Sequence, residues 1–217
     1  MKKIVLIFGL LGLLASCSKE MYDYSGTGNA YEMKAGEGYM RALAQELAPD
    51  CLIALESALA YDHYGYYEYA TSEYQTGGKS LRAEGSTWTV NSYRQMKGVK
   101  ISCIDSTSWK INYSGDYALQ GYEYPTVMEA TAVLLDTANA DQFSWKISFE
   151  GSRVERDGYA CSFKSNPSLT FSNHNSSYFG WGQCNGAAVM LVTKNSATVD
   201  ICRMEYLGNE SRYFRGK

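Results

Sequence analysis

The hydrophobic residues of this chain follow two different periods, one after the other. From Glu37 to about Tyr61, apolar residues recur three and four positions apart among helix-favouring alanines. Pro49 interrupts this pattern and is expected to kink the helix or to begin a second one. From about residue 84, apolar and polar residues alternate, as in strands with one buried face. The pattern predicts a helical part at about 37–65 and a β-rich part at about 84–216.

Turn signals divide the β-rich part into short runs. Two runs flank Asp105-Ser106-Thr107, which predicts a hairpin with one apolar face. Further turns are expected at Ser114-Gly115-Asp116, Asp157-Gly158 and Gly208-Asn209. The predicted fold class is mainly β (α+β), with an N-terminal helical segment followed by an antiparallel β-sandwich or barrel.

One tetrapeptide occurs twice in the β-rich part. Ser108-Trp109-Lys110-Ile111 and Ser144-Trp145-Lys146-Ile147 are identical in sequence and lie 36 residues apart. In each copy the isoleucine falls on the same strand face as the tryptophan. We therefore interpret both tryptophans as core residues of equivalent strands, with ligand stacking as the alternative.

The N-terminus has the pattern of an export signal. Lys2 and Lys3 precede an eleven-residue apolar run, Ile4–Leu14, which is followed by small residues. The run is shorter than the roughly 20 residues that span a bilayer. Leu14-Ala15-Ser16-Cys17 resembles the lipobox of a bacterial lipoprotein. The resemblance implies that residues 1–16 are removed and that Cys17 carries acyl chains such as palmitate, which anchor it to a membrane.

The residues after Cys17 suggest an address. Ser18 resembles the outer-membrane sorting choice of many Gram-negative bacteria, and Lys19-Glu20 resembles the charged surface-export tag of Bacteroidota lipoproteins. The resemblance implies a lipid-anchored protein of the outer membrane, on the cell surface or on the periplasmic face. Residues 17–36 are predicted to form a flexible tether, and residues 37–217 a single domain.

Charge and cysteine content narrow the picture. The net charge is −3 and no block of like charge occurs, which disfavours a nucleic-acid partner. Besides Cys17 the chain has five cysteines, and an oxidising compartment permits disulfides. We expect one or two bridges, whose pairing the sequence does not define.

The common catalytic and metal-binding motifs are missing. The sequence has no Gly-x-Ser-x-Gly elbow and no Cys-x-x-Cys pair, and its two histidines, His63 and His174, lack partners at metal-ligand spacing. The prediction is no catalytic residue, no metal site and no cofactor. Paired acids of a glycan hydrolase can come from distant strands, so four strand or turn acids stay open for that role: Glu150, Glu155, Asp157 and Glu205.

Tyrosine is unusually abundant, with 19 residues, beside 4 tryptophans. Aromatic residues concentrate at 61–74 and at 178–182, and rings beside carboxylates are typical of sugar-binding surfaces. Packing over the sheet is the alternative. The candidate ligand-binding residues are Tyr61, Tyr64, Tyr67, Tyr178 and Trp181.

Three functional hypotheses follow. The leading one is an outer-membrane lipoprotein with a non-enzymatic binding, adhesion or envelope-assembly role, whose partner is a glycan or another envelope protein. The second is a lipocalin-like barrel for a small apolar ligand, because Gly85-Ser86-Thr87-Trp88 resembles the lipocalin opening Gly-x-Trp with one extra residue. The third is a secreted glycan hydrolase.

Overall fold

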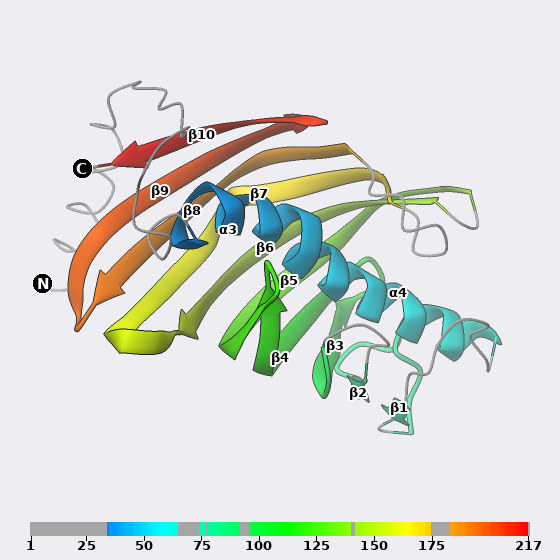
Figure 1. The fold of residues 1–217 in the computed structure, drawn as a ribbon. Coiled ribbons are helices and arrows are strands. Elements are labelled where there is room, and N and C mark those ends of the chain that lie inside the picture. The colour runs from blue at the N-terminus through cyan, green and yellow to red at the C-terminus, as the bar shows by residue number, and fades with distance from the viewer. Residues whose placement is uncertain are drawn as a thin grey trace, which may run out of the picture.

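The computed structural model describes residues 34–64, 74–76, 78–91, 96–139, 142–174 and 183–216. Four of the predicted site residues lie outside these ranges: Cys17, Tyr67, Tyr178 and Trp181. The predicted signal peptide, 1–16, and most of the predicted tether, 17–36, lie outside them as well. In the described part, a helical segment precedes a large antiparallel sheet (Figure 1).

The helical segment runs from Lys34 to Tyr64, close to the predicted 37–65. It comprises η1 (Lys34–Gly38), α3 (Tyr39–Ala42), η2 (Leu43–Leu47) and α4 (Ala48–Tyr64). The π-helical turn η2 ends at Leu47, two residues before Pro49. Proline gives no amide hydrogen and crowds the carbonyl four residues earlier, so the regular ladder breaks here without ending the helix.

The helix is buried on all sides. Every residue from Leu47 to Leu59 is buried, Asp50 and Glu56 included. An α-helix that is apolar around its whole circumference requires such an enclosed position. It lies across the concave face of the sheet (Figure 1). Within the described residues, no helix is both long enough and apolar enough to cross a membrane.

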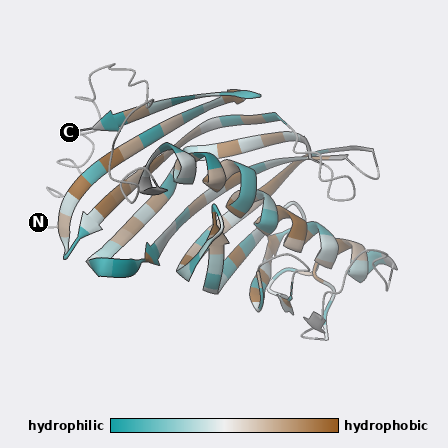
Figure 2. Ribbon diagram, viewed as in Figure 1, coloured by the Kyte–Doolittle hydropathy of each residue, from teal (hydrophilic) through white to brown (hydrophobic). Residues whose placement is uncertain are grey.

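Ten strands form one sheet in which each strand pairs with its neighbours in sequence. All pairs are antiparallel, and apolar and polar residues alternate along the strands (Figure 2). The strands are β1 (Tyr74–Thr76), β2 (Thr87–Val90), β3 (Val99–Asp105), β4 (Ser108–Leu119), β5 (Tyr122–Asn139), β6 (Gln142–Val154), β7 (Tyr159–His174), β8 (Gln183–Lys194), β9 (Ala197–Gly208) and β10 (Glu210–Gly216). A single 3-10 turn, η3 (Arg156–Gly158), separates β6 from β7.

The predicted fold class, mainly β with an N-terminal helical segment, is confirmed. The finer expectation of a sandwich or barrel needs correction, because the described strands form one open sheet. In that sheet β1 pairs only with β2, and β10 only with β9. The apolar helix covers the inner face, which in a sandwich a second sheet would cover.

The predicted β3–β4 hairpin is confirmed, with Cys103 opposite Trp109 and Ile101 opposite Ile111. The Asp105 carboxylate closes the turn by accepting hydrogen bonds from the Thr107 amide (2.8 Å) and the Ser108 hydroxyl (2.7 Å). These bonds lower the pKa of Asp105, that from Ser108 having the largest effect.

The turn predicted at Ser114-Gly115-Asp116 is wrong. Strand β4 continues through these residues, and Gly115 pairs with Thr126 of β5. The chain turns instead at Gln120 and Gly121, whose φ angles are 53° and 75°. Two successive positive φ angles match the twist of antiparallel strands in a two-residue hairpin loop.

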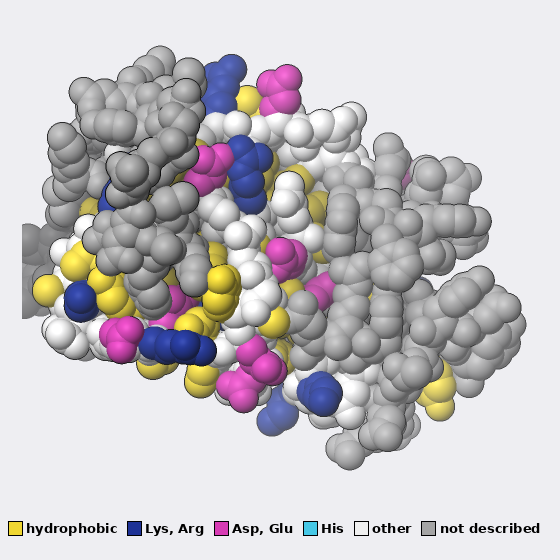
Figure 3. Space-filling model, in the orientation of Figure 1, with side chains coloured by type: hydrophobic (Ala, Val, Ile, Leu, Met, Phe, Trp, Pro, Cys, Tyr) yellow, Lys and Arg dark blue, Asp and Glu magenta, His cyan; other side chains and the backbone are white. Residues whose placement is uncertain are grey.

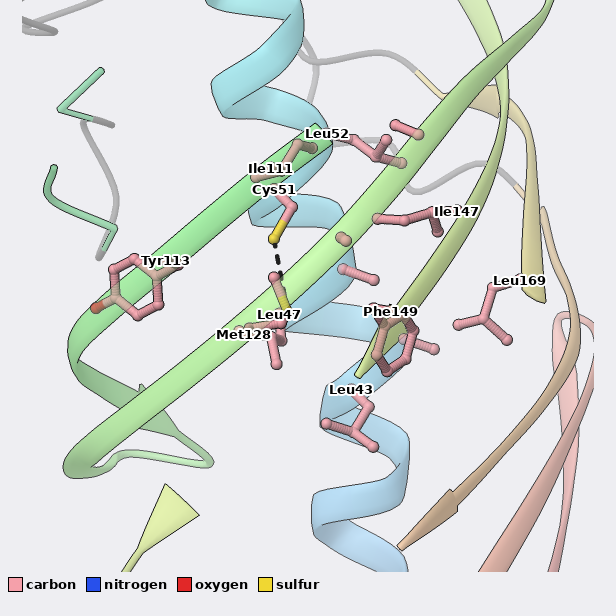
Figure 4. Close-up of a cluster of buried hydrophobic side chains, with 14 of the residues drawn as sticks. Leu43, Leu47, Cys51, Leu52, Ile111, Tyr113, Met128, Ile147, Phe149 and Leu169 are labelled. Atoms are coloured by element: carbon pink, nitrogen blue, oxygen red, sulfur yellow. Dashed lines mark hydrogen bonds between the residues drawn. The ribbon is translucent and has the colours of Figure 1, made fainter. Parts of the chain in front are cut away.

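The two repeated tryptophans are core residues, as predicted. Trp109 and Trp145 are fully buried and meet edge to face, with ring centroids 5.9 Å apart. The Trp145 indole donates a 2.7 Å hydrogen bond to Glu56 of α4, and the Tyr117 hydroxyl donates a 2.9 Å bond to Asp50. Polar bonds therefore fix the helix on a largely apolar interface (Figure 4).

The expected disulfides do not form within the described residues. Five cysteines are free and buried: Cys51, Cys103, Cys161, Cys184 and Cys202. The Cys51 thiol lies 4.0 Å from the Met128 sulfur, inside the helix–sheet interface (Figure 4). Burial raises the pKa of the Cys184 and Cys202 thiols to about 12, so these side chains behave as small apolar groups.

Candidate functional site

The structure describes one predicted ligand-binding side chain, that of Tyr61. Its half-buried ring packs against the core and meets Trp88 edge to face at 6.2 Å. Tyr64 ends α4, but its side chain lies outside the described residues, as do Tyr67, Tyr178 and Trp181. How the five predicted aromatic side chains lie relative to one another therefore falls outside the described residues.

One cluster of charged residues is buried beneath the first helical turns. The Arg153 guanidinium bonds the Glu155 carboxylate at 3.1 Å, and both side chains are 1% exposed. It also donates a 2.7 Å bond to the Tyr117 carbonyl and lies 5.6 Å from the ring centroid of Tyr39. Because solvent does not reach it, we assign this cluster a structural role, tying α3 to β4 and β6.

A second polar cluster lines a groove on the outer face of the sheet, opposite the helix. The groove has a volume of about 360 Å³. Strand alternation turns Trp109, Ala130 and Phe149 inward, so the polar residues beside them point outward. We call this hollow the outer groove; its lining residues are Lys110, Glu129, Ala130, Thr131, Ser148, Phe149, Glu150, Lys164, Ser165 and Pro167.

A bulge in β7 forms one wall of the groove. Ile147 pairs with Leu169, and Glu150 pairs with Lys164, so two residues of β6 oppose four of β7. The segment Ser165–Ser168 is two residues longer than the β6 segment that it faces, so part of it has to leave the plane of the sheet. The Ser165 hydroxyl holds the bulge by accepting a 3.0 Å hydrogen bond from the Phe149 amide and donating a 2.9 Å bond to the Pro167 carbonyl.

Gly186 of β8 allows the bulge to form. Its φ is +130°, and a Cβ placed there would lie 2.3 Å from the Ser168 carbonyl oxygen. A side chain at this position would collide with backbone, so only glycine fits. The groove wall therefore depends on a residue of the neighbouring strand.

Charged side chains cross the floor of the groove from strand to strand. Lys110 of β4 forms a 2.7 Å ion pair with Glu129 of β5, and Glu129 lies directly opposite Glu150 of β6. Glu150 in turn lies opposite Lys164 of β7. Two ammonium groups thus flank two carboxylates, beside the hydroxyls of Thr131 and Ser148. The arrangement offers fixed hydrogen-bond donors and acceptors to a polar ligand.

Of the four acids considered for hydrolysis, only Glu150 lines the groove. Glu155 is in the buried cluster, Asp157 lies in the exposed turn η3, and Glu205 pairs with Arg203 at 2.8 Å. Sequence reasoning missed Glu129, Lys110 and Lys164. Their outward strand positions could be recognised from alternation, but their proximity depends on the strand register.

Two further observations concern metal binding and the charge of the molecular surface. Among the described residues, no group of three or more His, Cys, Asp or Glu side chains is placed to hold a metal ion. Figure 3 shows the helix side of the molecule, opposite the outer groove, and side chains of both charges are interspersed on the described part of that face. Compared with protein-family models, curated proteins and solved structures, the chain has no match.

Proposed function

We propose that the protein is an outer-membrane-anchored lipoprotein with a non-enzymatic binding role, and that it binds an envelope glycan through the outer groove. The lipobox-like Leu14-Ala15-Ser16-Cys17 supports the anchor. The binding role rests on one observation, the polar hollow of about 360 Å³ on the solvent-facing side of the sheet. Volumes of this size accommodate small ligands or one unit of a polymer.

The construction of the groove supports recognition of a hydroxyl-rich polymer. Its polar side chains project from paired strands, so their spacing is set by the sheet, with strands about 4.8 Å apart. Hydroxyls of Thr131 and Ser148 lie beside the charged groups of Lys110 and Glu129. A ligand held by such groups exchanges hydrogen bonds with water for bonds with the protein, and preorganised donors and acceptors reduce the entropy lost on binding.

The proposal is tested by retention on purified glycans. Full-length protein in detergent is sedimented with peptidoglycan sacculi and passed over immobilised lipopolysaccharide. We expect binding to one of them, and at least tenfold weaker binding by the double variant Glu129→Gln/Glu150→Gln. Glu123→Gln, which neutralises an exposed acid of β5 outside the groove, serves as the control. Retention by neither glycan, or equal retention of the double variant, would overturn the proposal, and protease-sensitive retention would assign a protein partner instead.

One observation favours a second candidate function, glycan hydrolysis. Glu129 and Glu150 are directly opposite on neighbouring strands, and the Lys110 ion pair distinguishes the surroundings of one carboxylate from those of the other. Glycosidases use two carboxyl groups separated by about 5–9.5 Å, in unlike environments. If the wild-type protein releases reducing ends from sacculi and Glu150→Gln abolishes this release, hydrolysis is supported. If the sacculi stay intact, hydrolysis is excluded and binding is the only proposed role that remains.

The lipocalin-like alternative receives no such support. A lipocalin holds its ligand inside the barrel, whereas here α4 covers the concave face and the Trp109–Trp145 pair packs beneath it. We therefore place the proposed binding site on the outer face only.

A further inference from the structure

Two charged side chains of the outer groove have no ion-pair partner among the described residues. Lys110 and Glu129 form a 2.7 Å ion pair in which both side chains stay about half exposed. Glu150 and Lys164 are cross-strand partners by register, yet within the described part of the chain neither forms an ion pair within 4.0 Å. The groove thus presents one open carboxylate and one open ammonium, on neighbouring strands.

The position of Glu150 opposite Glu129 favours the binding of a cationic group between the two carboxylates. Like charges directly opposite each other on antiparallel strands are destabilising, and Glu150 lies opposite Glu129. A cation between the two carboxylates removes that repulsion, and it is attracted by both groups. On the other side, the Lys164 ammonium favours an anion.

The remaining lining residues favour a charged group of the glycan polymer, rather than a neutral sugar ring, at Glu150 and Lys164. The aromatic ring among them belongs to Phe149, which is 5% exposed and packs in the core 6.3 Å from Phe163. The described lining of the groove therefore offers no aromatic face for a pyranose to stack on. It offers opposite charges on strands about 4.8 Å apart, beside the hydroxyls of Thr131 and Ser148.

We propose that the outer groove binds an α-amino-acid end, a group with an ammonium and a carboxylate on one carbon. The ammonium lies at Glu150 and Glu129, and the carboxylate lies at Lys164, beside the wall formed by Ser165 and Pro167. This inference rests on the proposed function and names the chemistry recognised. A glycan polymer that carries short peptides with free amino-acid ends has both features.

The inference is tested with alanine as the probe. Binding of D- and L-alanine to the full-length protein in detergent micelles is measured by NMR, beside N-acetylalanine and alanine methyl ester. We expect alanine to bind in the millimolar range and each blocked form to bind at least tenfold more weakly, because each lacks one charge. Equal binding of the blocked forms, or no binding of alanine, would overturn the inference.

Two variants and two control variants test whether Glu150 and Lys164 bind the charged groups of alanine. Glu150→Gln and Lys164→Gln are each expected to weaken alanine binding at least tenfold. Glu123→Gln and Lys146→Gln neutralise exposed residues of β5 and β6 outside the groove lining and should bind as wild type does. Unchanged melting temperatures show that all four variants fold. If the groove variants lose retention on sacculi or lipopolysaccharide but the wild-type protein does not bind alanine, this inference alone is overturned. If the wild-type protein is retained by neither glycan, the proposed function is overturned.

Discussion

At the scale of single residues, the charged side chains on the inner face mostly have a specific hydrogen-bond or ion-pair partner. Arg153 is the clearest case, with its guanidinium against Glu155, the Tyr117 carbonyl and the Tyr39 ring. A buried charge is tolerated only when its hydrogen-bonding groups are satisfied. The outer groove differs, because Glu150 and Lys164 remain open to solvent and to a ligand.

Removing the buried cation should be costly. Arg153→Met removes the cation that faces the buried Glu155 carboxylate, so we expect the free energy of unfolding to fall by about 3–5 kcal/mol. Arg41→Met is the control, since Arg41 and Glu37 form an exposed pair one helical turn apart and its loss should cost less than about 1 kcal/mol. Urea denaturation measures both, and similar losses would contradict the structural role of the buried cluster.

The buried thiols should make stability depend on alkaline pH. Burial raises the pKa of Cys184 and Cys202 to about 12, whereas an unfolded thiol titrates near about 8.5. As pH rises above that value, the unfolded state loses thiol protons that the folded state retains, so the free energy of unfolding falls. Urea denaturation between pH 8 and 11 should show a smaller decline for Cys184→Ala/Cys202→Ala. An equal decline in wild type and variant would show that these thiols do not contribute.

At the scale of elements, the bulge of β7 creates the site. Two residues of β6 face four of β7, and the surplus forms the wall of the outer groove. Gly186 on β8 leaves room for the Ser168 carbonyl. A regular strand here would give a flat outer face, so the groove is a consequence of register and not of any one polar residue.

A methyl group at residue 186 should therefore damage both the sheet and the groove. Gly186→Ala puts a Cβ 2.3 Å from the Ser168 carbonyl oxygen, so the bulge has to move. Gly98→Ala is the matched control, because Gly98 also has a positive φ, +69°, with nothing within 4 Å of the added atom. We expect about 1–2 kcal/mol of destabilisation for Gly98→Ala with glycan retention unchanged. Gly186→Ala should lose more stability and also lose retention; unchanged retention would contradict the bulge's role.

Sequence patterns among neighbouring residues predicted most of the elements. Features that depend on pairing between strands could not be predicted. The repeated Ser-Trp-Lys-Ile identified Trp109 and Trp145 as core, and Asp105 marked its turn, because each depends only on residues nearby. The turn expected at Gly115 is wrong, since pairing with β5 overrides that local preference. The groove could not be predicted, because Glu129 meets Glu150 only through the β5–β6 register.

At the scale of the whole molecule, one sheet has two faces with different roles. The concave face holds a helix that is buried from Leu47 to Leu59, and it carries the stabilising core. The outer face carries the groove, whose four charged side chains, Lys110, Glu129, Glu150 and Lys164, project away from the core. This separation allows a protein tethered through Cys17 to present a binding surface on a rigid body, as we propose.

The tether has its own test. Cells expressing the full chain are labelled with a radioactive fatty acid, and we expect incorporation into the wild-type protein, because Cys17 occupies the lipidated position of the lipobox-like sequence. Cys17→Ser should abolish the label, whereas Cys103→Ser, at a buried position in β3, should keep it. Label in the Cys17→Ser protein would exclude the proposed anchor.

The most direct test of the central claim, that the outer groove is the binding site, is hydrogen–deuterium exchange of the full-length protein with and without soluble peptidoglycan fragments. The account predicts slower exchange in the fragments that contain the β7 bulge, Ser165–Ser168, and the groove residues of β5 and β6, with exchange in α4 unchanged. Protection confined to α4 or to strands β2 and β3, with none at the bulge, would contradict the claim that the outer groove is the binding site.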